Sequence, residues 1–237
     1  MTAGGPGVCW AARLVVAAFV VGAPGAARAQ SGPGLRPWRP VFELAAGWNG
    51  ASDLGRVDAT TRATSVGTAT APPFRLFTTE SELGAAPAVL AAVVLPVSRH
   101  WAVAVRGGAV RPTLATRISA DAEGAPTVEA TEEVSDYTVD VSVLYQLPRL
   151  GGRRARPYLV AGGGYLRQLH EDNVLVETGR TWHGGAGLRW WLRGGDQATR
   201  AVGLTGEARW VWRSGGIAFA DGARTMPAAA LGLFVGF

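Results

Sequence analysis

Side chains alternate between apolar and polar at every second position in repeated segments of this chain. The clearest segment covers residues 137–147. One of its faces carries Tyr137, Val139, Val141, Val143, Tyr145 and Leu147, and the other carries Thr138, Asp140, Ser142 and Gln146. Successive side chains of a β-strand point to opposite faces, whereas a helix repeats about every 3.6 residues. The pattern therefore predicts a strand with one apolar face and one polar face.

Eight segments show such alternation or a related apolar run, and together they predict an all-β fold. They cover residues 41–48, 85–95, 101–111, 137–147, 158–169, 181–192, 202–213 and 226–237. The second segment is apolar on both faces, so a buried helix over residues 83–97 is an alternative there, which Pro87 and Pro96 disfavour. An even number of antiparallel strands suits a closed barrel, which leaves no unpaired edge in hydrocarbon.

The connections between these segments alternate in length. Residues 96–100, 148–156 and 193–201 form short connections, whereas residues 49–84, 112–136, 170–180 and 214–224 form longer ones. Bacterial transmembrane barrels have short periplasmic turns and longer extracellular loops. The alternation therefore predicts that both ends of the barrel domain lie on the periplasmic side and that the longer connections are extracellular loops.

The first residues have the features of a cleavable export signal. Arg13 precedes an apolar run over residues 14–21, and Ala27-Arg28-Ala29 supplies a cleavage site with small residues at both ends. A membrane anchor is the alternative, but the apolar run is shorter than the roughly 20 residues that a spanning helix needs. We predict a signal peptide over residues 1–29, an N-terminal periplasmic segment over residues 30–40 and a barrel domain over residues 41–237.

The last strand and the aromatic residues favour a barrel that faces lipid. Leu231, Leu233, Val235 and Phe237 form one apolar stripe that ends at the terminal residue. Aromatic residues also recur near the predicted strand ends, which is the girdle arrangement at membrane interfaces. The predicted girdle residues are Trp48, Trp101, Tyr137, Tyr145, Tyr158, Trp182, Trp190 and Trp212.

With these features, the chain resembles the small eight-stranded bacterial outer-membrane β-barrels of the OmpA and OmpW types. The resemblance implies an all-β, eight-stranded antiparallel up-and-down transmembrane β-barrel in the outer membrane of a Gram-negative-type bacterium. It also implies a C-terminal assembly signal, formed by Leu233, Val235 and Phe237 and read by the barrel assembly machinery. Outer-membrane lipids are then the expected surroundings, and we expect a monomer. A soluble sandwich or lipocalin-like barrel is the alternative, in which the apolar faces would point inward.

The polar faces place charged residues inside such a barrel. Arg106, Asp140, Arg189, Glu207 and Arg209 are predicted to form an ion-pair network in the lumen, because an unpaired charge in a narrow interior is costly. Eight strands enclose little more than their own side chains. We therefore expect a structural or surface-interaction barrel with a plugged lumen. Relatives of the OmpW type suggest an alternative, the passage of small hydrophobic molecules.

A lipid A-modifying outer-membrane enzyme is the competing function. Its candidate residues are His170, Glu171, His183 and Ser214, but no nucleophile and base can be paired from the sequence, and the G-x-S-x-G signature is missing. We expect no catalytic activity. A formal net charge of +5 does not predict nucleic-acid binding.

The sequence also predicts no metal site and no cofactor. Acidic residues gather in one connection, at Asp121, Glu123, Glu129, Glu132 and Glu133, but without the spacing of an EF-hand. The only cysteine lies within the predicted signal peptide, so the mature chain offers no thiolate ligand and no disulfide.

Overall fold

The computed structural model describes residues 39–61, 74–147, 150, 152, 154–170, 175–193, 200–217 and 223–237. The predicted signal peptide lies outside these residues, as does the predicted periplasmic segment except for Arg39 and Pro40. Every regular element in the described part is a β-strand. No helix there is long and apolar enough to cross a membrane.

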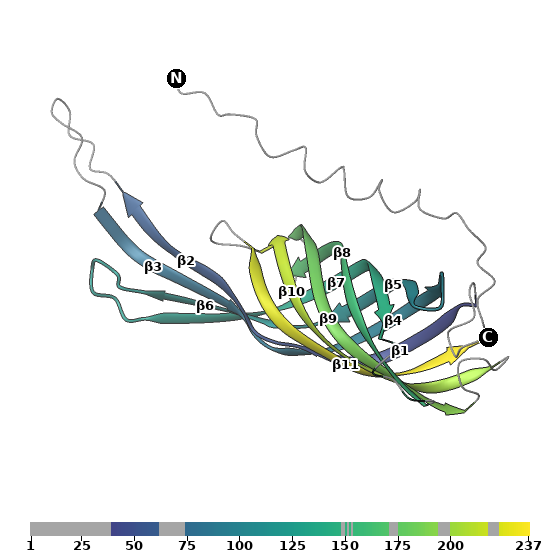
Figure 1. Cartoon of the computed structure of the whole chain (residues 1–237). Helices are drawn as coiled ribbons and strands as arrows, with labels where there is room; N and C mark the ends of the chain where they lie inside the picture. Colours follow the sequence, from purple (N-terminus) through teal and green to yellow (C-terminus); the bar gives the residue numbers. More distant parts are fainter. Residues whose placement is uncertain are drawn as a thin grey trace, which may run out of the picture. The chain divides into compact units, whose positions relative to one another are not determined.

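Eight of these strands close into an antiparallel barrel (Figure 1). They are β1 (Val41–Asn49), β4 (Ala86–Pro96), β5 (Trp101–Val110), β7 (Val128–Gln146), β8 (Ala155–His170), β9 (Val176–Arg193), β10 (Ala201–Gly215) and β11 (Arg224–Gly236). Each strand pairs with the next in this order, and β11 pairs with β1 over the full length of β1. The predicted eight-stranded up-and-down barrel is confirmed. The alternative helix over residues 83–97 is wrong, because most of that segment forms β4.

Three further strands occupy regions that we expected to be loops. They are β2 (Ser52–Thr61), β3 (Phe74–Leu83) and β6 (Thr113–Ser119), and they pair in the order β2-β3-β6-β7. This four-stranded sheet projects from one end of the barrel (Figure 1). Its strands carry charged or hydroxyl side chains on both faces, so no apolar stripe marks them in the sequence. The expectation that residues 49–84 and 112–136 form only loops is therefore wrong.

The barrel has its apolar side chains outside and its charges inside. Leu44 is 64% exposed, Leu231 66% and Trp182 58%. Glu43 and Arg106, by contrast, are buried on the inner faces of β1 and β5. A soluble barrel buries its apolar face. The faces are therefore those of a transmembrane barrel, which excludes the lipocalin-like arrangement.

Apolar clusters pack at both ends of the interior. We call the end where β1 begins and β11 ends the base, and the end nearest β2, β3 and β6 the mouth. The base cluster contains Val41, Val94, Ala102, Ala104, Leu144, Tyr158, Val160, Trp191, Ala201 and Phe234. The mouth cluster contains Leu54, Leu83, Leu114, Val134 and Ile217. The polar part of the interior lies between these clusters.

Candidate functional site

The barrel interior is the candidate functional site, because it holds several charged side chains away from water. The buried charged residues are Glu43, Arg106, Asp136, Asp140, Arg189, Glu207 and Arg213, and the side chain of Arg209 is only 9% exposed. Strand alternation on β1, β5, β7, β9 and β10 directs them inward. Such charges are tolerated when each has an ionic or hydrogen-bonding partner.

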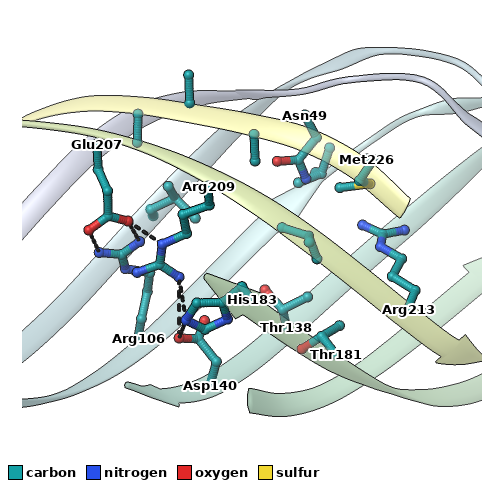
Figure 2. Close-up of a pocket in the computed structure, with 16 residues that line it drawn as sticks. Asn49, Arg106, Thr138, Asp140, Thr181, His183, Glu207, Arg209, Arg213 and Met226 are labelled. Carbon is teal, nitrogen blue, oxygen red and sulfur yellow. Dashed lines mark hydrogen bonds and ion pairs between the residues drawn. The ribbon is translucent and has the colours of Figure 1, made fainter. Parts of the chain in front are cut away.

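Glu207 is the centre of the network (Figure 2). Arg106 donates from Nη1 to Glu207 Oε1 at 2.8 Å and from Nη2 to Oε2 at 3.3 Å. Arg209 also donates from Nε to Glu207 Oε1. The Tyr158 hydroxyl donates to Oε2 at 2.8 Å. Two guanidinium groups and a phenol therefore surround one buried carboxylate, which supplies the charge compensation that its burial requires.

Asp140, Ser142 and His183 extend this network across the lumen. The Ser142 hydroxyl lies 2.9 Å from His183 Nε2 and donates to Asp140 Oδ1 at 3.0 Å. Arg209 Nη1 lies 3.5 Å from Asp140 Oδ1 and 3.1 Å from His183 Nε2. In a catalytic triad the acid holds the ring nitrogen remote from the serine. Here Asp140 lies on the same side of the ring as Ser142, 3.7 Å from the His183 Nε2 atom that the serine contacts. The arrangement is therefore a hydrogen-bond network and lacks triad geometry.

A second ion pair lies next to the base cluster. Arg189 donates to Glu43 Oε1 from Nε at 3.0 Å and from Nη2 at 2.5 Å. The Arg189 guanidinium also lies 5.3 Å from the ring centre of Tyr158 and 6.0 Å from that of Phe234, within the range of cation–π attraction. Arg189 is only 2% exposed. Arg189 and its partners therefore occupy the interior next to the base cluster.

A third polar group lies near the mouth. Arg213 Nη1 donates to Asp136 Oδ2 at 2.7 Å, and Gln168 Nε2 donates to Asp136 Oδ1 at 2.7 Å. Gln168 Oε1 in turn accepts the backbone N–H of Ile217 at 2.9 Å. Ile217 belongs to the mouth cluster. Polar and apolar contacts thus meet at the mouth.

A small cavity lies within the interior formed by the described residues, with a volume of about 70 Å³. Its lining includes Asn49, Arg106, Thr138, Asp140, Thr181, His183, Glu207, Arg209, Arg213 and Met226, which Figure 2 labels. A cavity needs only about 10–15 Å³ of such volume to hold one water molecule, so the space suits a few waters. Pockets for drug-sized ligands are commonly about 300–1,000 Å³. The cavity therefore has room for solvent or a very small ion and not for a larger molecule.

Four of the five predicted lumen residues lie together, and the fifth lies apart. Arg106, Asp140, Glu207 and Arg209 form one connected group, whereas Arg189 pairs with Glu43. Five further polar residues of the interior were not predicted as part of the network: Glu43, Ser142, His183, Asp136 and Arg213. Their signal was present in the sequence, since each occupies the polar face of its strand.

Most of the predicted girdle residues lie on the outer surface of the barrel. Trp48, Trp101, Tyr137, Trp182, Trp190 and Trp212 are exposed. Tyr145 is partly exposed and contacts Trp101, with 4.7 Å between ring centres. Tyr158 is 2% exposed and faces the lumen, so its assignment to the girdle is wrong. Its neighbour Leu159 takes the outward position, because alternation on β8 turns the even-numbered side chains inward.

The proposed assembly signal lies on the outer face of β11. Leu233, Val235 and Phe237 are exposed, and the Phe237 ring contacts Phe42 of β1 with 5.9 Å between ring centres. The last residue of the chain therefore packs next to the first barrel strand. Recognition of these residues by the assembly machinery stays a prediction.

The residues considered for catalysis are not assembled at the rim. His183 is buried in the lumen, Ser214 is exposed, and His170 Nδ1 lies 2.8 Å from Glu132 Oε1. Glu171 lies outside the described residues. The described part thus brings none of these candidates together as a nucleophile and its base.

The acidic residues of the 112–136 region take part in separate local contacts. Asp121 Oδ1 accepts the backbone N–H of Glu123 at 2.8 Å, and Glu129 lies 3.8 Å from Arg117. Within the described residues, no group of three or more His, Cys, Asp or Glu side chains is arranged to hold a metal ion.

No protein-family model and no curated protein matches this sequence. Among solved structures, the chain is similar to the outer membrane protein OprG from Pseudomonas aeruginosa, with a TM-score of 0.51, 11% identity, and coverage of 86% of this chain and 98% of OprG. It also matches Ail, the attachment invasion locus protein of Yersinia pestis, with a TM-score of 0.40, 9% identity, and coverage of 85% and 100%. The outer membrane protein AlkL matches with a TM-score of 0.43, 16% identity, and coverage of 91% and 97%. The likeness to OprG and the strand order show that the chain has the fold of the small eight-stranded outer-membrane β-barrels.

Proposed function

We propose that this protein is an integral barrel of the bacterial outer membrane, with a lumen closed by its own side chains, that presents the sheet β2-β3-β6-β7 at the cell surface. The observation that carries the proposal is the orientation of the side chains, which is opposite to that of a soluble barrel. The outer wall is apolar, and the charged side chains are paired inside. Hydrocarbon stabilises such a wall, whereas water does not. The proposal includes no catalytic step.

The projecting sheet supports a role in surface interaction. One of its faces carries a row of alternating charge across all four strands, formed by Arg56, Glu80, Arg117 and Glu129 in register. These side chains are largely exposed, at 57% for Arg56 and 71% for Glu129. An ordered charged surface at this end would meet other molecules before the barrel wall does.

Membrane insertion can be tested by the gel mobility of the outer-membrane fraction with and without boiling in detergent. A closed barrel resists detergent until it is heated, so the unboiled protein should migrate faster. Deletion of Phe237 should reduce the faster band several-fold, because it removes the proposed assembly signal and the contact with Phe42. A protein in the soluble periplasm whose mobility is insensitive to boiling would contradict the proposal.

Passage of small hydrophobic molecules is the alternative role, and conductance and uptake distinguish it from a closed barrel. The cavity of about 70 Å³ and the Arg189–Glu43 pair near the base favour closure. We expect the purified protein to give no sustained conductance in planar bilayers and no uptake of a small apolar dye into vesicles. Arg189→Ala should raise ion leakage measurably. Rapid dye uptake by the wild type would favour passage.

A further inference from the structure

We propose that Arg167 and Arg180, on the outer wall of β8 and β9 near the mouth, bind the phosphate group of a phosphorylated glycolipid in the outer leaflet. The inference rests on the proposed function, because only insertion with the mouth outward brings this wall against that leaflet.

Each arginine lies two residues closer to the mouth than an aromatic residue on the same outer face. Arg180 is two residues from Trp182 on the same face of β9, a separation of about 7 Å along a strand. Arg167 is likewise two residues from Tyr165 on β8, and it pairs in register with Tyr137 of β7. Both arginines are exposed. Aromatic girdles mark the level of the headgroups, so these guanidinium groups lie at or just above that level.

The two arginines are close enough to share one ligand. Arg167 pairs in register with Thr178, and Arg180 follows Thr178 by two residues on the same face. Such diagonal neighbours on adjacent strands have backbone positions about 7–8 Å apart, within reach of long side chains. Two guanidinium groups at this separation can donate to different oxygens of one phosphate.

Neither arginine has an acidic partner in the described part of the chain, whereas the buried arginines of the lumen do. Arg106 and Arg189 are paired inside the lumen, and Arg56 is paired on the projecting sheet. The residues diagonal to Arg167 and Arg180, apart from the arginines themselves, are Ser135, Val139, Gly163, Val176, Trp212 and Gly216. Like charges on neighbouring strands are unfavourable, and a bound phosphate would offset that repulsion.

The surroundings suit a lipid better than a free ion. The exposed hydroxyl residues Thr178 and Ser214 pair in register with Arg167 and Arg180, respectively, and offer further hydrogen-bond donors. Towards the base, the Trp182 ring lies against Gly163, since a Cβ added there would be 2.6 Å from Trp182 Cε3. The ring therefore packs over Gly163 on the outer wall and offers an apolar surface for an acyl chain on the base side of the two arginines.

Lipid binding to nanodisc-embedded protein tests this assignment. Wild-type protein in phosphatidylcholine nanodiscs is titrated with fluorescent diphosphoryl lipid A and, separately, with the same lipid after removal of its phosphates. We expect tighter binding of the phosphorylated lipid to the wild type. The double variant Arg167→Gln/Arg180→Gln should lose roughly tenfold to thirtyfold in affinity, since each basic residue near an anionic lipid contributes about 1 kcal/mol.

The double variant Arg75→Gln/Arg193→Gln is the matched control, because it removes two exposed positive charges away from the mouth end of β8 and β9 and should bind as the wild type does. Equal affinities in all three proteins would overturn the assignment, as would displacement of lipid A by millimolar inorganic phosphate. Gel mobility without boiling verifies that every variant is folded. If the wild type fails to insert at all, the proposed function fails as well, whereas insertion without phosphate preference contradicts this inference alone.

Discussion

Replacement of Glu207 with alanine should lower the free energy of unfolding by about 3–5 kcal/mol, the cost of breaking a buried ion pair by removing one partner. Arg106 would lose both of its hydrogen bonds to the Glu207 carboxylate, and Arg209 and Tyr158 would lose one each. Arg209 would keep Asp140 as a counter-charge, whereas Arg106 would have no carboxylate of the described residues in hydrogen-bond contact. Urea unfolding in lipid vesicles, followed by tryptophan fluorescence, measures the change.

The matched control is Glu80→Ala, which removes a carboxylate from an exposed pair with Arg56 on the projecting sheet. Exposed ion pairs contribute about 0–1 kcal/mol, so this variant should unfold near the wild-type midpoint. Glu207→Gln should fall between the two, because it keeps hydrogen-bonding capacity without the charge. A Glu207→Ala protein as stable as Glu80→Ala would show that water readily replaces the carboxylate and that the lumen is not closed as proposed.

The ion pairs explain why a barrel of this size can carry so many charges. Each buried cation of the central and base groups has a carboxylate within 4 Å, and Glu207 serves two of them. Apolar clusters lie towards both ends of this polar section. The interior therefore substitutes paired charges for an apolar core, while the wall carries the apolar surface. Such an interior is stable only when the pairs are complete, which is why the effect of Glu207→Ala is expected to be large.

The faces of the strands could be predicted from the sequence, but the partners inside the lumen could not. Period-two alternation assigns Glu43 and Arg189 to inner faces from their immediate neighbours alone. Their contact depends on how far each strand is staggered against the next around the barrel, and the two residues are 146 positions apart. No local pattern encodes that stagger. The sequence therefore indicated a lumen network and left the Glu43–Arg189 pair unassigned.

The two remaining errors have local causes. Tyr158 stands near a predicted strand end, which favours the girdle, but position along a strand does not determine which face a side chain takes. Alternation with Leu159 and Val160 places Tyr158 inside. The strands β2, β3 and β6 were missed because neither face of the projecting sheet packs on a large core. Their backbones extend the pairing of barrel strands instead, and backbone pairing has no sequence signature of its own.

Gly164→Ala should prevent normal closure between β7 and β8 and destabilise the barrel by about 3 kcal/mol or more, at the upper end of overpacking effects. A Cβ at this position would lie 2.3 Å from the Val139 carbonyl oxygen and 2.6 Å from Asp140 Cα. Both are backbone atoms of the neighbouring strand and cannot rotate away. The two strands would have to separate beside Asp140, which would also disturb its contact with Arg209. The folded fraction and the urea midpoint report the loss.

Gly107→Ala on β5 separates this steric effect from the general effect of losing a strand glycine, because nothing lies within 4 Å of an added Cβ there. Its stability should stay within about 1 kcal/mol of the wild type, and a small gain would agree with the lower backbone entropy of the unfolded alanine chain. Equal stability of Gly164→Ala and Gly107→Ala would show that β7 and β8 lie farther apart at Gly164 than this contact requires. The spacing of Asp140, Ser142 and His183 would then differ as well. The steric prediction therefore also tests the geometry of the lumen, without any measurement of binding or conductance.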